Sequence, residues 1–218
     1  MRAHAAGAAV RETPRAERIA WLNGAADRLA DNVDLLVEIA GDETHLDEPR
    51  LRAEMARTTA QLRLFGDVIA DGHYLEVIID HADAAATPPR PDLRRMLRAV
   101  GPVAVFAASN FPFAFSVAGG DTASALAAGC PVVVKAHPGH PETSRETARL
   151  VQASLDDAGA PKGAFDIVEG LQEGVDLAGD RAIKAVEQAI DHAREADMPE
   201  RVDELRARTA AIRAMRND

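Results

Sequence analysis

The chain has 218 residues, of which 47% are hydrophobic and 28% charged, and this balance fits one domain or two small ones with a hydrophobic core. Its formal net charge of -10 argues against nucleic acid and anionic membrane surfaces as partners, and its single cysteine excludes an internal disulfide framework. Because the longest apolar stretch, near residues 100–108, is far too short to cross a bilayer, we expect a cytoplasmic protein.

Helical periodicity marks the first third of the chain. Apolar residues recur at spacings of three, four and seven over residues 14–40, which predicts an amphipathic helix that ends near Gly41. A second stripe runs from Leu51 to Phe65 and predicts another helix to about Ala70, preceded by a capped turn. We therefore expect residues 1–73 to form a helical N-terminal segment that packs through its apolar faces.

The hydrophobic period changes near Gly72. Tyr74 and the run 77–79 predict one strand, residues 94–98 predict a second, and the proline-rich stretch 87–91 separates them. We expect a strand pair over residues 74–100. It fits a projecting arm that pairs with a second copy in a homo-oligomer, and it fits a simple hairpin between domains nearly as well.

Residues 101–186 alternate short apolar runs with helical patterns. We expect strands at 102–107, 131–134 and 164–168, and helices at 115–128 and 142–158. This order predicts an α/β fold with a partial Rossmann-like parallel sheet and right-handed crossovers. Ligands of such sheets bind beyond the carboxyl ends of the strands, where Asn110, Lys135 and Gly170 stand.

The composition changes again in the last segment, residues 187–218. This segment is polar, charged and rich in Ala and Arg. Its sparse apolar residues predict a divergent tail of two thin amphipathic helices that are broken near Pro199.

Two segments of the α/β region resemble the aldehyde dehydrogenase superfamily. The first, residues 101–112, ends in Asn110-Phe111-Pro112, and the second, residues 127–135, ends in Val134-Lys135. Four further stretches, at residues 80–83, 88–97, 116–126 and 135–138, resemble one branch of that family in particular, the α-ketoglutaric semialdehyde (2,5-dioxovalerate) dehydrogenases. The resemblance extends from about Pro14 to Val186.

The resemblance implies an aldehyde substrate that is oxidised to an acid, with NADP as the cofactor and NAD also allowed. It gives Asn110 the role of oxyanion donor, since an amide on a rigid turn stabilises the charge that develops on the former aldehyde oxygen. Local sequence alone also fits a turn residue that bonds its own backbone. Lys135 would hold the adenine ribose or its 2′-phosphate, the alternative being a solvated lysine at a strand end. Pro138 stands where members that prefer NAD often carry Glu.

The cofactor-binding residues that the resemblance implies are Ala108, Ser109, Asn110, Lys135, His137 and Gly170. Gly170 would lie under the adenine, although a plain turn glycine fits nearly as well. His137 and His140 either line a 2′-phosphate pocket or lie on the surface, and we expect no metal site because no third ligand is near in sequence. Cys130 precedes a buried strand and has no adjacent basic partner, so a structural role is expected.

The resemblance stops near Val186. Residues 182–186 resemble the strand that precedes a Gly-Phe-Thr-Gly-Ser turn in the family, but here Glu187 follows, and neither the family's nucleophilic Cys nor its general-base Glu comes after it. Without a thiolate no hemithioacetal forms, so we expect a truncated fragment that is inactive alone. A frameshift, a truncated gene or an unusual fusion would each explain the divergent tail after Val186. A non-catalytic binding module and a decayed gene product are the alternative functions.

Overall fold

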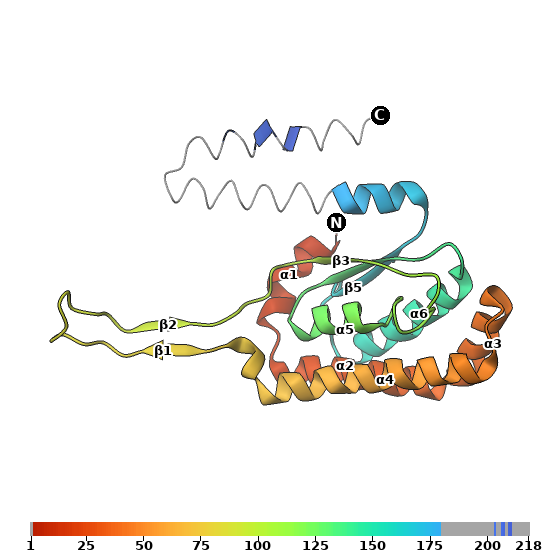
Figure 1. Cartoon of the computed structure of the whole chain (residues 1–218), viewed down its shortest axis with the longest axis horizontal. Coiled ribbons are helices and arrows are strands. Elements are labelled where there is room, and N and C mark those ends of the chain that lie inside the picture. The colour runs from red at the N-terminus through yellow and green to blue at the C-terminus, as the bar shows by residue number, and fades with distance from the viewer. Residues whose placement is uncertain (1, 180–202, 204–205, 208, 211–218) are drawn as a thin grey trace.

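The structure is a computed structural model that describes residues 2–179, 203, 206, 207, 209 and 210 (Figure 1). It combines helices with a short parallel sheet, so the expected fold class is confirmed. The strand expected at 182–186 and the tail break near Pro199 lie outside the described residues. Within the described part of the chain, no helix is long and apolar enough to cross a membrane.

Four helices form the N-terminal part. They are α1 (Arg2–Glu12), α2 (Arg15–Asp31), α3 (Val33–Thr44) and α4 (Glu48–Asp71). The single helix expected over residues 14–40 is wrong, because the helical hydrogen-bond pattern stops at Asn32. The side-chain amide of Asn32 donates to the carbonyl of Arg28 at 2.8 Å, and this local bond competes with continuation of the helix. Helix α1 was not expected, since its buried positions include the small residues Ala3 and Ala6, which give a weak periodic signal.

Helix α4 confirms the second expected helix and its capped start. The Asp47 carboxylate accepts the backbone N–H of Arg50 at 2.8 Å, which satisfies one of the unpaired donors of the first turn. The helix ends at Asp71 and is capped by Gly72, whose φ of 80° lies in the left-handed region that favours glycine.

The expected sheet is confirmed as three parallel strands in the order β3-β4-β5. The α/β elements are β3 (Val103–Phe106), α5 (Gly120–Ala127), β4 (Val132–Lys135), α6 (Pro141–Asp157) and β5 (Phe165–Val168). The helix expected over residues 115–128 begins only at Gly120. The carbonyl groups before Gly120 accept hydrogen bonds that close the loop instead of helical ones. The carbonyl of Phe115 accepts the N–H of Ala108, and the carbonyl of Ala114 accepts the N–H of Gly120.

The two faces of the sheet have different covers. Figure 1 shows α5 and α6 beneath the sheet, with α2 and α4 beneath them. Val105 and Val134 on this face belong to the same buried cluster as Trp21 of α2 and Leu51 of α4. On the opposite face, a small cluster joins Val133 to α1 and to the helical residues 171–179. One continuous core therefore connects the N-terminal helices to the sheet.

The expected strand pair is confirmed as an antiparallel ribbon that projects from the body (Figure 1). Its strands, β1 (Ile78–Asp80) and β2 (Leu93–Arg95), are shorter than expected and exposed along their whole length. Tyr74 is not part of the strand, because it lies in the short helix η1 (His73–Leu75). Left-handed residues at Gly72 and Glu76 bracket that helix and delay the start of the extended chain.

Candidate cofactor-binding site

The carboxyl ends of the three strands meet at one edge of the sheet. Phe106 and Lys135 are partners in the β3–β4 register, and the N–H of Ala107 donates to the carbonyl of Lys135 at 3.0 Å. On the other side of β4, the N–H of Ala136 donates to the carbonyl of Val168 at 2.9 Å. The segments that follow the strands, residues 107–110, 136–140 and 169–170, therefore begin side by side, where the parallel topology places a ligand.

His140 ties the first two of these segments together. It is completely buried, with 0% of its surface exposed, so the surface alternative is wrong for this residue. Its Nε2 lies 2.9 Å from the carbonyl oxygen of Ala108, and its Nδ1 lies 3.1 Å from Oγ of Ser144. Because a carbonyl oxygen only accepts, Nε2 carries the proton in this bond. His140 thus fixes the loop that contains Ser109 and Asn110 against the start of α6.

His137 lies beside His140 in the loop between β4 and α6. The rings of the two histidines stack with centroids 5.6 Å apart, and Nδ1 of His137 accepts the N–H of Gly139 at 3.0 Å. Burial, together with the nearby His140 and Lys135, lowers the pKa of His137 below its usual value, which favours the neutral imidazole. A Cβ built on Gly139 would lie 3.0 Å from Nδ1 of His137 and 3.9 Å from Cβ of Ser109. Ser109 and His137 therefore both lie next to Gly139.

Lys135 is half-buried at the end of β4. Its methylene groups pass over Gly174, where a Cβ would come within 3.2 Å of the lysine Cε. No carboxylate among the described residues forms an ion pair with its ammonium group. Gly170 precedes the same helical segment with a φ of 102°, a value that the turn itself restricts to glycine.

Asn110 is exposed at the tip of the loop after β3. Its backbone carbonyl accepts a hydrogen bond from Nη2 of Arg50 at 2.9 Å. Within the described part of the chain, its side chain makes no hydrogen bond to the backbone of its own turn. The alternative interpretation, a turn residue that bonds its own backbone, is therefore wrong. The side-chain amide is available to a ligand at this edge.

Sequence reasoning missed two glutamates that hold these loops. Glu43 of α3 accepts the backbone N–H groups of Glu142 and Thr143 at 2.7 and 2.8 Å and the hydroxyl of Thr143 at 2.7 Å. Burial acts to raise the pKa of Glu43, but the hydrogen bonds from Thr143 and Glu142 outweigh it and leave the pKa below its usual value. Glu54 of α4 accepts the N–H groups of Phe113 and Ala114. Neither role has a local sequence signal, because each glutamate is distant in sequence from its partners.

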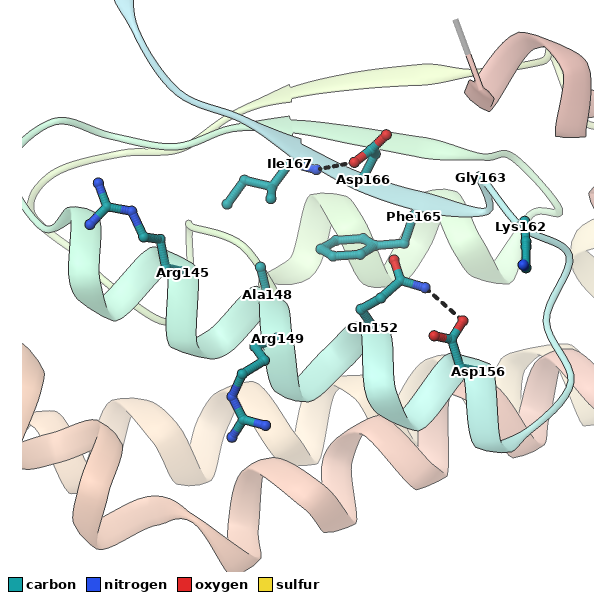
Figure 2. Close-up of a pocket in the computed structure, with 10 residues that line it drawn as sticks. All are labelled: Arg145, Ala148, Arg149, Gln152, Asp156, Lys162, Gly163, Phe165, Asp166 and Ile167. Atoms are coloured by element: carbon teal, nitrogen blue, oxygen red, sulfur yellow. Dashed lines mark hydrogen bonds between the residues drawn. The ribbon is translucent and has the colours of Figure 1, made fainter.

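A cavity lies outside this edge. It has a volume of about 530 Å³, lies between α6 and β5 and is lined by Arg145, Arg149, Lys162 and Phe165 among others (Figure 2). Arg145 is paired with Glu142 and Glu169, and Arg149 with Glu146, so these guanidinium groups are already neutralised.

The chain's cysteine and its acidic and histidine side chains offer neither a reactive group nor a metal site within the described residues. Cys130 is 2% exposed and belongs to the hydrophobic core, which confirms its structural position. In the residues that the structure describes, no group of three His, Cys, Asp or Glu side chains is placed to hold a metal ion.

The model of the aldehyde dehydrogenase family matches residues 1–189. The chain belongs to the aldehyde dehydrogenase family. One curated relative, alpha-ketoglutaric semialdehyde dehydrogenase 2 of Azospirillum brasilense, is 52% identical over 163 residues, which are 74% of this chain and 31% of the relative. This aldehyde dehydrogenase chain therefore spans about a third of the length of that relative.

Solved structures of the family share the fold of this aldehyde dehydrogenase chain. The NAD-dependent benzaldehyde dehydrogenase from Corynebacterium glutamicum is 25% identical with a TM-score of 0.65, over 83% of this chain and 36% of its own. The glyceraldehyde-3-phosphate dehydrogenase GapN from Methanocaldococcus jannaschii, complexed with NADP, is 20% identical with a TM-score of 0.63, over 78% of this chain and 35% of its own.

Proposed function

We propose that this chain is the cofactor-binding part of an NADP-dependent aldehyde dehydrogenase. The observation that carries the proposal is the meeting of Lys135, His137 and Ser109 at the carboxyl edge of the parallel sheet. A lysine ammonium suits a 2′-phosphate as a point charge, and Pro138 adds no acidic group that would repel it. Family structures that bind NADP and NAD support a nicotinamide cofactor in general, and Lys135 is our reason for preferring NADP.

The roles follow from the positions of the side chains. Lys135 and His137 would hold the adenine ribose and its phosphate, Ala108 and Ser109 would contact the cofactor through the loop after β3, and Gly170 would lie under the adenine. When bound, the nicotinamide supplies the acceptor for hydride. Asn110 would donate its side-chain amide to the oxyanion, an interaction worth about 2.7–4 kcal/mol in other enzymes.

The substrate that we propose is α-ketoglutaric semialdehyde, oxidised to 2-oxoglutarate. The support is the 52% identity to a relative named for that aldehyde. We further propose that the chain alone does not oxidise aldehydes, because its single cysteine, Cys130, is buried in the core and cannot reach a substrate. NADPH binding without aldehyde-dependent NADPH formation is the combined result expected from this chain.

The first test replaces Lys135 with methionine, which keeps the length of the side chain and removes the charge. NADPH affinity, measured by the change in NADPH fluorescence, is expected to fall about tenfold, while NADH affinity falls less, because only NADPH carries the 2′-phosphate. The matched control is Lys162→Met, an exposed lysine that is not at this edge. A wild-type chain that does not bind NADPH, or equal losses for both cofactors, would contradict the proposal.

The exposed ribbon supports a second proposal, a homo-oligomer formed through β1 and β2. Two strands alone are marginally stable in water and leave unpaired backbone groups at their edges. The register places Ile78 and Leu93 on one face together with Asp80 and Arg95. Because this face carries apolar groups and charges of both signs, it is complementary to a second copy of itself.

Charged substitutions on that face test the oligomer. The double variant Ile78→Lys and Leu93→Lys is expected to sediment as a monomer, whereas the wild-type chain sediments as a dimer or larger species at micromolar concentration. Leu64→Lys is the control, since Leu64 is an equally exposed apolar residue of α4 away from the ribbon. A monomeric wild-type chain would refute the proposed assembly.

A further inference from the structure

One face of α4 lies against the loop that presents Asn110. Arg50, Glu54 and Arg57 follow one another at spacings of four and three, so they share a face of the helix. Arg50 donates to the carbonyl of Asn110, and its guanidinium carbon lies 5.5 Å from the centre of the Phe111 ring. The guanidinium carbon of Arg57 lies 5.2 Å from the centre of the Phe115 ring. Three side chains on two successive turns of α4 therefore contact residues 110–115.

Glu54 makes the buried contact in this group. Glu54 is 6% exposed. Its Oε1 accepts two consecutive backbone N–H groups, from Phe113 at 2.8 Å and from Ala114 at 2.9 Å. Among the described residues, Oε2 of this carboxylate is buried without a hydrogen-bond partner, so the two bonds at Oε1 are what offsets the cost of burying it. Bonds to a charged acceptor are also stronger than neutral ones. This carboxylate therefore holds a fixed stretch of backbone that starts three residues after Asn110.

The loop is also closed on itself above Glu54. The N–H of Ala108 donates to the carbonyl of Phe115 at 2.8 Å, so the two ends of the segment 108–115 are joined. With its ends joined and its far side held by Glu54 and Arg50, the segment has little freedom left at Asn110. Groups that stabilise a developing charge must be held within about 0.5 Å of the productive geometry by such supporting contacts.

We propose that Glu54 is a positioning residue that orients Asn110 by fixing the backbone of Phe113 and Ala114. The proposal rests on the proposed function in one respect, because it takes the loop of Ala108, Ser109 and Asn110 to be the segment that meets the cofactor. Glu54 itself lies beneath the loop and is buried, so it acts only through the backbone and is not a catalytic residue.

The test compares Glu54→Ala and Glu54→Gln in the full 218-residue chain, with Asp67→Ala as the control for an exposed carboxylate of the same helix. Amide hydrogen exchange is measured by NMR. In Glu54→Ala, the amides of Phe113 and Ala114 are expected to exchange at least about tenfold faster, while the amides of Trp21 and Leu29 in the core keep their wild-type rates. Glu54→Gln retains an acceptor oxygen and should restore most of the protection.

If Glu54→Ala does not fold, Glu54→Gln still decides the question. A neutral acceptor makes a weaker bond, so the amide proton resonances of Phe113 and Ala114 should move upfield in this variant while those of the core stay in place. Unchanged amide proton resonances of these two residues in Glu54→Gln, or unchanged exchange of their amides in a folded Glu54→Ala, would overturn the proposal. Equal acceleration of the core amides would reduce Glu54 to a general stabilising residue and would overturn it as well.

NADPH affinity separates this proposal from the proposed function. A looser loop is expected to weaken NADPH binding about tenfold in Glu54→Ala and to leave it near the wild-type value in Glu54→Gln. A wild-type chain that binds no NADPH would refute the cofactor site, whereas the exchange rates of Phe113 and Ala114 would still test the positioning contact. Normal NADPH affinity in Glu54→Ala, with fast local exchange, would show that the loop is held by Glu54 but does not serve the cofactor, which overturns the positioning role.

Discussion

The variant His140→Leu is expected to lower the free energy of unfolding by about 2–3 kcal/mol. Leucine fills a similar volume, so the loss comes mainly from the hydrogen bonds rather than from a cavity. The part-buried carbonyl of Ala108 would lose its donor, and Oγ of Ser144 would lose its contact with Nδ1. Urea denaturation followed by circular dichroism measures the effect as a shift of the midpoint at constant slope.

The same variant should also release the loop after β3 and weaken NADPH binding, because His140 is the side chain that ties this loop to the start of α6. For stability alone, His137→Leu is the matched control, since His137 is half-buried and its hydrogen bond to Gly139 lies within its own loop. We expect this control to cost less than about 0.5 kcal/mol. Similar losses of stability in the two variants would mean that the hydrogen bond between His140 and Ala108 does not stabilise the fold more than an ordinary loop contact does.

The variant Glu43→Ala is expected to lower the free energy of unfolding by about 1.5–3 kcal/mol at pH 7, which is the second large effect. The carboxylate accepts two N–H groups and a hydroxyl at the first turn of α6, and a negative charge is also favourable at a helix N-terminus. Glu38→Ala, an exposed glutamate of the same helix α3, is the control and should change stability little.

The contribution of Glu43 depends on pH in a defined direction. Its pKa in the folded chain is below the usual value, because the hydrogen bonds from Thr143 and Glu142 outweigh the opposing effect of burial. The folded state therefore binds this proton less tightly than the unfolded state does. The stabilisation is complete above the unfolded pKa of about 4.3 and is lost as the pH falls through the lower, folded pKa. Thermal melts from pH 7 to pH 3 should show the wild-type and Glu43→Ala curves converging at the acid end. A gap that is constant with pH would contradict this role.

The sheet could be predicted from the sequence because its signals are local. Val132, Val133 and Val134 form an unbroken β-branched run, and the order of strands and helices then places Lys135 and Asn110 at the same edge. The N-terminal helices were predictable as helices but not in their limits. The break at Asn32 depends on one side-chain hydrogen bond, which an apolar stripe does not reveal.

The supporting contacts of the site could not be predicted, because they join residues that are far apart in the chain. Glu54 bonds residues 59 and 60 positions away, and Glu43 bonds residues 99 and 100 positions away. His140 belongs to a loop whose prolines already explained its shape, so its buried bond to Ala108 had no separate signal. Each of these residues is polar and, in sequence alone, fits a solvated surface.

The anchoring of both site loops on the N-terminal helices has a thermodynamic consequence. Glu43 on α3 holds the start of α6, and Glu54 on α4 holds the loop that carries Asn110. Any change that loosens α3 or α4 lowers the fraction of molecules whose loops are ready for a ligand, and a bound ligand must steady those helices by the same free energy. Remote substitutions in the first 71 residues can therefore tune affinity at the sheet edge without touching it.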